Sequence, residues 1–179
     1  MRASAGLRRC ASSGAIPRFP RVGVACIVFQ ENAIPFARSE QQRLDVSKVL
    51  LVKRGRPPSQ GLWSTPGGSV QYRETLVQAG IREVREETGL ETVAPEQWML
   101  TTTETITPSS KEHAGFHYVL IHIALLAVRA DRASLTPIPG DDAADARWAS
   151  LEEVYASPKT HVTGLGDILA TACERFGER

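Results

Sequence analysis

Three glutamates lie close together in residues 74–88, a stretch that has no proline and many good helix formers. On a helix, Glu83, Glu86 and Glu87 fall on one stripe. The neighbouring stripe is apolar and should face the core: Val77, Ile81, Val84 and Thr88. Carboxylates three or four residues apart on a helix repel one another, so the acidic stripe needs a cationic partner. Because a hard divalent cation prefers carboxylate oxygens, waters and phosphate oxygens, the three glutamates are predicted metal ligands.

Arg82 lies within reach of this acidic stripe, because it precedes Glu86 by one helical turn. Its planar guanidinium can form two parallel hydrogen bonds with one carboxylate. We therefore predict that Arg82 holds Glu86 or Glu74 in place and does not touch the substrate. In the alternative interpretation the helix is only solvated, and its carboxylates pair with Arg82 and Arg85 at the surface.

Glycines mark both ends of the predicted helix and one position inside it. Gly67 and Gly68 precede the helix and predict a sharp turn that exposes backbone carbonyl and amide groups next to the carboxylates. Gly89 follows the helix, where a left-handed cap residue is expected. Gly80 costs about 1 kcal/mol relative to alanine inside a helix, which predicts close packing of the helix against the Gly67–Gly68 loop.

The spacing of these residues resembles the signature of a known family. The fixed residues are, in order, Gly68, Glu74, Arg82, Glu83, Val84, Glu86, Glu87, Gly89 and Leu90. They match the Nudix box of the Nudix hydrolase superfamily without a departure. The resemblance implies an α/β fold, the Nudix-type α/β/α sandwich with a mixed β-sheet. It also implies that the carbonyl of Gly68 joins Glu83, Glu86 and Glu87 as a ligand of Mg²⁺ or Mn²⁺.

The activity implied by the resemblance is metal-dependent hydrolysis of a pyrophosphate bond in a nucleoside diphosphate linked to another moiety. A bound metal would neutralise charge and activate the attacking water. Glu83, Glu87 or a carboxylate from a later loop would take the proton of that water. In this interpretation the catalytic residues are Glu83, Glu86, Glu87, Arg82 and Glu74.

Candidate substrate-binding residues lie outside the box. Arg54 and Arg56 end a predicted strand beside Gly67 and Gly68, where they and the neighbouring Lys53 could hold a diphosphate. His117 and Tyr118 should point to opposite faces of a long strand, so that one of them, with Tyr118 favoured, could line a nucleobase pocket. The aromatic residue before the glycine turn, Trp63, is expected to fill the core.

Several further polar residues are predicted to have mainly structural roles. The loop over residues 101–113 contains Glu104 and Glu112, which are candidates for the catalytic base. A second acidic group precedes Trp148 and is predicted to form a polar turn, although it could reach a metal: Asp141, Asp142 and Asp145. His122 is predicted to be structural. The two remaining histidines are expected to face solvent: His113 and His161.

The whole chain limits the classes of function. With 179 residues, of which 42% are apolar, it has room for one domain with a full core. A net charge of +1 gives no field that would attract extended nucleic acid or an anionic membrane. Three distant cysteines indicate neither a disulfide framework nor a zinc site. We therefore expect a small-molecule nucleotide partner, no membrane span, and a homodimer as an open alternative to a monomer.

The first 20 residues differ from the rest of the chain. They contain several arginines, and no acidic residue occurs before Glu31. This composition resembles an organelle transit peptide, which predicts a mitochondrial location. The alternative is a cytoplasmic protein with a disordered leader or an upstream start codon. In both cases residues 1–20 are a leader, and residues 21–179 form the Nudix domain.

Hydrophobic runs and turn residues predict an alternation of strands and helices. A strand buried on both faces is expected over residues 22–29, and a loop over residues 31–47. Further strands are expected over residues 49–52, 62–66, 96–106, 115–128 and 144–149, of which 115–128 should be central. Besides the helix at 74–88, residues 151–156 and 164–175 are predicted helices. Such an alternation indicates an α/β domain with a mixed sheet.

The sequence around the box also bears on the substrate. The segments RVGVACIVF, VLLVKRGRPP, GLWSTPGG and FHYVLIHIALLAV resemble the small ADP-ribose pyrophosphatase-like branch of the superfamily. Hydrolases of ADP-ribose often carry a proline about 15 residues after the box, whereas Pro95 and Pro108 lie at other spacings. The leading hypothesis is hydrolysis of an ADP-ribose-like nucleotide sugar. The alternatives are a nucleoside triphosphate pyrophosphohydrolase that cleans the nucleotide pool and a non-catalytic module that binds nucleotide or RNA.

Overall fold

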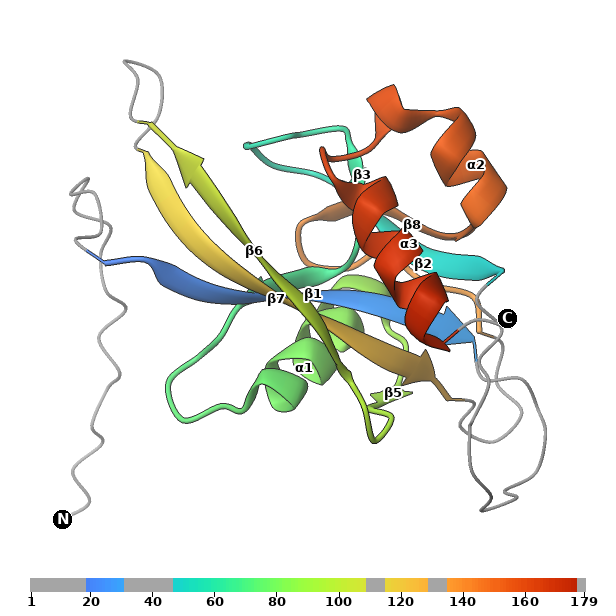
Figure 1. Ribbon diagram of the computed structural model, residues 1–179, viewed down its shortest axis with the longest axis horizontal. Coiled ribbons are helices and arrows are strands. Elements are labelled where there is room, and N and C mark those ends of the chain that lie inside the picture. The colour runs from blue at the N-terminus through green and yellow to red at the C-terminus, as the bar shows by residue number, and fades with distance from the viewer. Residues whose placement is uncertain (1–18, 31–46, 109–114, 129–134, 177–179) are drawn as a thin grey trace, which may run out of the picture.

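The computed structural model describes residues 19–30, 47–108, 115–128 and 135–176 (Figure 1). Several sequence predictions fall outside these ranges. They are the leader up to residue 18, nearly all of the loop over residues 31–47, and the side chains of Glu112 and His113. Among the described residues no helix is both long enough and apolar enough to cross a membrane.

The larger of two sheets has five strands around a parallel pair (Figure 1). The pair consists of β1 (Arg21–Gln30) and β7 (Phe116–Ala127), which run parallel along their length. The short strand β4 (Gly67–Ser69) pairs antiparallel with β1. On the other side, β5 (Thr92–Val93) and β6 (Met99–Thr107) pair antiparallel with β7. The sheet is therefore mixed, and β7 is central, as predicted.

The smaller sheet has three antiparallel strands, in the order β3 (Trp63–Ser64), β2 (Lys48–Arg54) and β8 (Ala143–Ser150). One predicted strand and one predicted turn need correction. Residues 62–66 form only the two-residue strand β3. Gly67 and Gly68 were expected to make a sharp turn, but they begin strand β4. A side chain at Gly67 would collide with the carbonyl oxygen of Val24, so the glycines let β4 lie close against β1.

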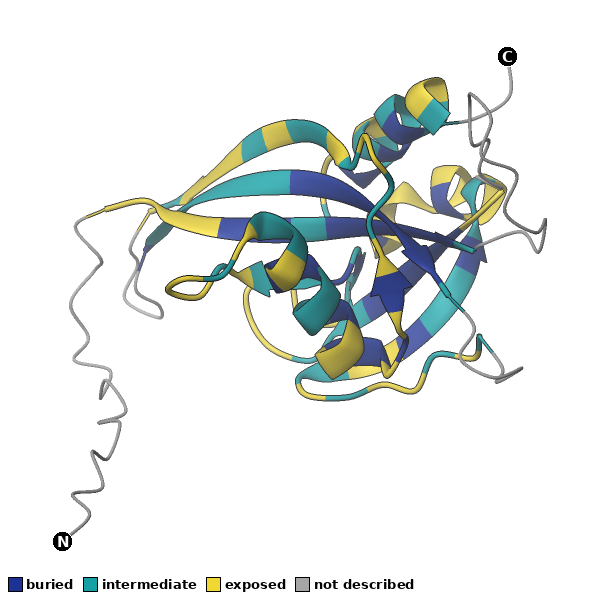
Figure 2. Cartoon of the chain, turned by 90° about the horizontal axis from the view of Figure 1, so that it is seen from below, coloured by how far each residue is buried: buried dark blue, intermediate teal, exposed yellow. Residues whose placement is uncertain are grey.

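β1 is buried on both faces, as predicted, and therefore separates two cores. Figure 2 shows the buried residues, in dark blue, concentrated on the strands. Ile27 and Phe29 face a core shared with β2 and with α3 (Leu165–Phe176). Val24, Cys26 and Val28 face a second core, which is shared with β7 and with α1 (Leu76–Thr88). Helices thus cover both faces of the strand layer, which confirms the α/β sandwich.

α1 begins two residues later than predicted, because Thr75 is its N-cap. The Thr75 hydroxyl accepts the Gln78 amide at 3.2 Å, and the Gln78 side chain accepts the Thr75 amide at 2.9 Å. This reciprocal capping box satisfies two backbone donors that the first turn leaves free. The helix ends as predicted at Gly89, whose φ of 68° is the left-handed conformation that favours glycine.

The buried face of α1 differs from the predicted apolar stripe. Its buried residues are Ala79, Gly80, Val84, Glu87 and Thr88, whereas Val77 and Ile81 are only partly buried. Gly80 causes this rotation, because a side chain there would collide with Ile123 of β7 and would lie 3.0 Å from the Cys26 sulfur of β1. The helix therefore packs on the sheet at Gly80, and not on the Gly67–Gly68 loop as predicted. As a consequence Glu87 lies on the buried side of the helix.

The C-terminal elements follow the predicted boundaries within one residue. α2 (Leu151–Ala156) is capped by Ser150, a short 3₁₀ helix η1 (Pro158–Thr160) follows, and α3 completes the first core. The expectation that His161 faces solvent is wrong, since only 5% of it is exposed. A parallel backbone bridge to Trp63 draws His161 inward, and the ring Nδ1 lies 2.8 Å from the carbonyl oxygen of Ser157.

The two helical glycines Gly80 and Gly166 should respond in opposite ways to alanine. Gly80→Ala must displace Ile123, so we expect it to lower the free energy of unfolding by about 1–2 kcal/mol. At Gly166 a Cβ would lie 3.4 Å from Tyr155, an ordinary contact, so Gly166→Ala should raise stability by up to about 1 kcal/mol. Urea unfolding of both variants checks this. Equal stabilisation by both would contradict the packing role of Gly80.

Candidate active site

Four segments meet at the site: the second half of α1, strand β4, the end of β2 and the turn before β8. α1 supplies the acidic side chains, because its buried face turns Glu87 toward the sheets while Glu83 and Glu86 stay nearer its rim. β4 brings the backbone of Gly67 and Gly68 against them. The end of β2 supplies arginines. Chain segments that are far apart in sequence thus contribute the different charges of the site.

Arg82 binds three of the carboxylates and one strand. Its Nε and Nη2 donate to the two oxygens of Glu74 at 2.8 and 3.0 Å, which is the forked pair that the sequence predicted. Nη1 donates to Glu83 at 2.7 Å and to Glu86 at 3.0 Å. Nη2 also donates to the backbone carbonyl of Ser69 at 3.1 Å. These bonds, with that to Glu74 the strongest, hold the pKa of Arg82 above its ordinary value, so the residue is a permanent cation.

Glu87 is the most buried carboxylate of the group, with 7% of the residue exposed. Burial raises its pKa from 4.5 to about 8, and the neighbouring charges of Glu83 and Asp142 act in the same direction. The Gly67 amide, which donates to Glu87 Oε2 at 3.1 Å, and the charge of Arg54 oppose this rise. A carboxylate in this setting is stabilised as an anion by any cation that enters the site.

Glu83 lies directly against the backbone of Gly68. A Cβ at Gly68 would lie 2.6 Å from Glu83 Oε2, so a larger residue here would require the Glu83 carboxylate to move away. Burial raises the pKa of Glu83, and the hydrogen bond from Arg82 opposes the rise. Glu86 is more accessible, with 46% of its side chain exposed. The carboxylate of Glu83 and the Gly68 backbone therefore lie side by side, as they would in a shared ligand set.

The oxygen atoms of this cluster fit a hard divalent cation. Glu83, Glu86 and Glu87 supply carboxylates from one helix, and the backbone of Gly68 lies against Glu83. Within the described ranges, no three acidic, histidine or cysteine side chains already point to one common centre. Glu83 and Glu86 instead both accept hydrogen bonds from Nη1 of Arg82.

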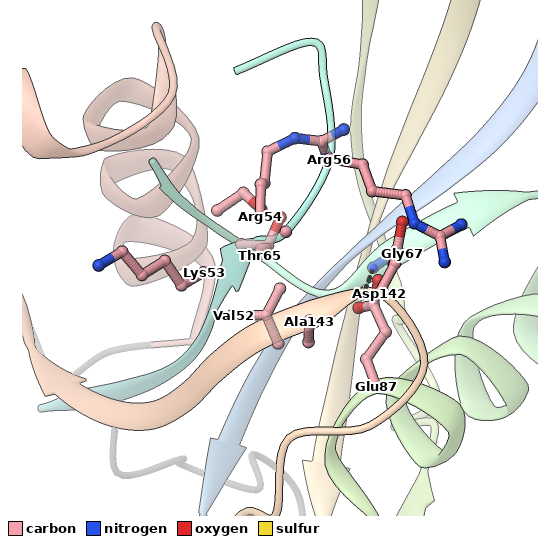
Figure 3. A pocket seen from close by; sticks show the side chains of 11 residues that line it. Val52, Lys53, Arg54, Arg56, Thr65, Gly67, Glu87, Asp142 and Ala143 are labelled. Carbon is pink, nitrogen blue, oxygen red and sulfur yellow. Dashed lines mark hydrogen bonds between the residues drawn. The ribbon is translucent and has the colours of Figure 1, made fainter. Parts of the chain in front are cut away.

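A hollow beside Glu87 contains the predicted arginines (Figure 3). Its polar lining comprises Arg54, Arg56, Ser64, Thr65, Gly67, Glu87 and Asp142. Arg54 is held in part by its own loop, since its Nε donates to the Pro58 carbonyl at 2.8 Å. Lys53 lines the same hollow with its base, but its side chain extends away from Glu87 (Figure 3). The hollow thus places guanidinium groups next to the carboxylates.

Asp142 lies at the candidate site, although the sequence predicted mainly a polar turn at this position. It was grouped with Asp141 and Asp145 in a polar turn, but the structure separates the three. Asp141 forms the turn with a φ of 49°, and Asp145 accepts the amide of Ala146 at 2.8 Å. Asp142 instead lines the hollow opposite Glu87. The only signal in the sequence was its place shortly before the strand that carries Trp148.

Tyr118 borders the site but its hydroxyl is already bound. It lies 3.1 Å from the Ser69 hydroxyl, and Arg21 donates to it at 3.3 Å. His117 points to the other face, as predicted, where its Nε2 lies 2.6 Å from Glu104. Glu104 is therefore paired on β6 and is not brought to the acidic cluster.

The remaining aromatic and histidine candidates are structural. Trp63 packs against the first core, as expected, and the Arg147 guanidinium lies 4.7 Å from its ring centre. His122 is buried, its Nε2 lies 2.8 Å from the Thr103 hydroxyl, and burial lowers its pKa. Neither side chain is among those that line the hollow beside Glu87.

Arg82→Lys should weaken the site without unfolding the protein. Lysine keeps the charge but cannot bind Glu74, Glu83, Glu86 and Ser69 together. We expect a 10–100-fold loss of Mn²⁺ affinity, the usual order for residues that orient metal ligands, measured by electron paramagnetic resonance. Arg85→Lys is the matched control on the same helix, because Arg85 pairs only with the exposed Glu91 in the described structure. Equal affinities of both variants would refute the role of Arg82.

The buried Glu87 predicts a pH dependence of stability in the metal-free protein. Its pKa is about 8 in the fold and near 4.5 when unfolded, so between these values the folded state binds more protons. The free energy of unfolding should fall as pH rises through this window, by a few kcal/mol, since each tenfold change in proton affinity is worth about 1.4 kcal/mol. When unfolding is measured in the presence of a chelator, the free energy of unfolding of Glu87→Gln should vary less with pH than that of the wild type. Parallel curves would argue against a buried, protonated Glu87.

Comparison with known proteins gives a consistent result. A model of the NUDIX domain matches residues 20–172. The chain is 29% identical over 160 residues to the phosphatase NudJ of Escherichia coli K12, which covers 89% of this chain and 86% of NudJ. It is 48% identical over 44 residues to an ADP-ribose pyrophosphatase of Methanocaldococcus jannaschii, and this match covers 25% of this chain and 26% of that relative. The chain thus spans about a quarter of the archaeal relative.

Two solved structures show the same fold. A NUDIX hydrolase from Nitrosomonas europaea superposes with a TM-score of 0.60 at 22% identity, covering 88% of this chain and 91% of that chain. The NUDIX domain of NrtR from Shewanella oneidensis, solved in complex with ADP ribose, gives a TM-score of 0.57 at 24% identity, covering 88% and 89%. Since the family model extends over nearly all of the described fold and the box is complete, the chain belongs to the NUDIX domain family and is a Nudix pyrophosphohydrolase.

Proposed function

We propose that this enzyme hydrolyses the pyrophosphate bond of an ADP-ribose-like nucleotide sugar, with Mg²⁺ or Mn²⁺ as cofactor. The observation that carries the proposal is the arrangement of Arg54 and Arg56 beside Glu87, on the helix whose other carboxylates Arg82 organises. A diphosphate needs cations on its outer oxygens, and a metal site needs carboxylates. Both requirements meet at Glu87, which lines the hollow with the two arginines and lies on the same helix as Glu83 and Glu86.

The residues of this chain have distinct tasks in such a reaction. Arg54 and Arg56 bind phosphate oxygens and orient the diphosphate over Glu87. Glu83, Glu86 and Glu87, together with the Gly68 carbonyl, would hold the divalent cation. That cation, when bound, supplies charge neutralisation and a more acidic water. The Gly67 amide fixes Oε2 of Glu87, and a carboxylate of the cluster takes the proton of the attacking water.

The choice of substrate class rests on the relatives. The archaeal relative is named as an ADP-ribose pyrophosphatase, and the NrtR domain was solved with ADP ribose. An adenosine diphosphate linked to a sugar also places its two phosphates in the middle of the molecule. The arginines at the end of β2 would then contact the diphosphate while the two outer groups extend to either side.

Turnover of a substrate panel tests the proposal. We expect Mg²⁺-dependent release of AMP and a sugar phosphate from ADP-ribose, at a rate well above that for nucleoside triphosphates or dinucleotides. Release of pyrophosphate from nucleoside triphosphates as the dominant reaction would support nucleotide-pool cleaning instead. Nucleotide binding without any turnover would support a non-catalytic module.

Glu86→Gln provides the site-specific control for this panel. The change removes one charge from an exposed helix position, and we expect a loss of turnover of at least about 100-fold. Glu91→Gln is the matched variant, because both side chains are 46% exposed and both accept a hydrogen bond from an arginine. Glu91→Gln should retain activity within a factor of about two. Similar activities of the two variants would place the metal site elsewhere.

A further inference from the structure

The segment before β8 returns across the C-terminal end of α1. The amide of Ile138 donates to the carbonyl of Thr88 at 2.9 Å, and the amide of Gly140 donates to the carbonyl of Glu87 at 3.0 Å. Helix ends leave their last carbonyls without partners inside the helix. Here a distant segment satisfies two of them, in the same turn of the helix that carries Glu86 and Glu87.

The same segment then binds the end of β2. The amide of Ala143 donates to the carbonyl of Gly140 at 3.0 Å and closes a turn. Within that turn the carbonyl of Asp142 accepts the amide of Gly55 at 3.0 Å. Gly55 stands between Arg54 and Arg56 in the sequence. Residues 140–142 therefore link the acidic helix to the arginine-bearing end of β2 through backbone bonds alone.

Gly140 is needed at this link for space and not for its backbone conformation. Its φ is not among the left-handed values found at other glycines of the described chain. A Cβ at this position, however, would lie 2.5 Å from the carbonyl oxygen of Glu86. That atom belongs to the helix backbone, so it cannot rotate away as a side chain would. Any residue larger than glycine must push the turn and the helix end apart.

We propose that Gly140 is a positioning residue, which fixes the distance between the metal-binding half of the site on α1 and the phosphate-binding half on β2. The proposal rests on the proposed function of these two halves. A displacement of α1 relative to β2 separates Glu86 and Glu87 from the arginines. Misplacement of reacting groups by about 1 Å can lower turnover on the order of 100-fold.

Gly140→Ala tests the proposal by metal affinity and by turnover. We expect the dissociation constant for Mn²⁺, measured by electron paramagnetic resonance, to rise about 10-fold or more, and kcat to fall by a similar factor. Ile138→Ala should change neither quantity more than about two-fold, because the residue is 71% exposed and its backbone donor remains. The affinity measurement does not depend on the substrate, so it decides the role of Gly140 even if the wild type hydrolyses no member of the panel.

A stability-matched variant separates positioning from general weakening of the fold. Val154→Ala shortens a buried side chain of α2 in the other core, and it should destabilise the protein while leaving Mn²⁺ affinity within about two-fold. Equal losses in Val154→Ala and Gly140→Ala would overturn the proposal, as would wild-type Mn²⁺ affinity in Gly140→Ala. If Gly140→Ala does not fold, a glycine inserted between Asp141 and Asp142 lengthens the link without adding a side chain. The same Mn²⁺ criterion then decides.

Discussion

The rest of the site depends on the hydrogen bonds of the Arg82 guanidinium. It joins Glu74, Glu83 and Glu86 to the backbone of β4. One positive charge cannot offset the charges of three carboxylates, so the cluster keeps an excess of negative charge. This excess is what a divalent cation can neutralise. Arg82 thus arranges the carboxylates and still leaves the site electrostatically incomplete, which favours metal binding.

The burial of Glu87 gives this site an asymmetry. One edge of the carboxylate group is enclosed by β4 and the hollow beside β2, while Glu86 at the other edge remains in contact with solvent. Electrostatic interactions are stronger on the enclosed side, because less water screens them. A diphosphate held by Arg54 and Arg56 would therefore meet the cluster at its least hydrated point.

The structural features that depend on residues close together in the sequence were predicted correctly. The α1 helix, its glycine cap and the bond of Arg82 to Glu74 follow from spacing within a few turns. Its rotation did not follow, because a contact between Gly80 and Ile123 sets it, and no local pattern reveals this contact. The place of Asp142 depends on backbone bonds to α1 and β2, and the burial of His161 depends on a bridge to Trp63. The errors thus lie where distant segments meet.

The parallel pairing of β1 and β7 has a consequence for how the protein acquires its site. Arg21 and Tyr118, which lie at matching positions of this pair, are 97 residues apart in the chain. Contacts of such separation lose much chain entropy before they are stabilised, and proteins that depend on them fold slowly. α1 can form as a local helix early, but the surface that buries Gly80 and Glu87 requires β1 and β7 together. A nascent chain that ends before β7 would therefore carry the complete box and yet expose its acidic helix to solvent.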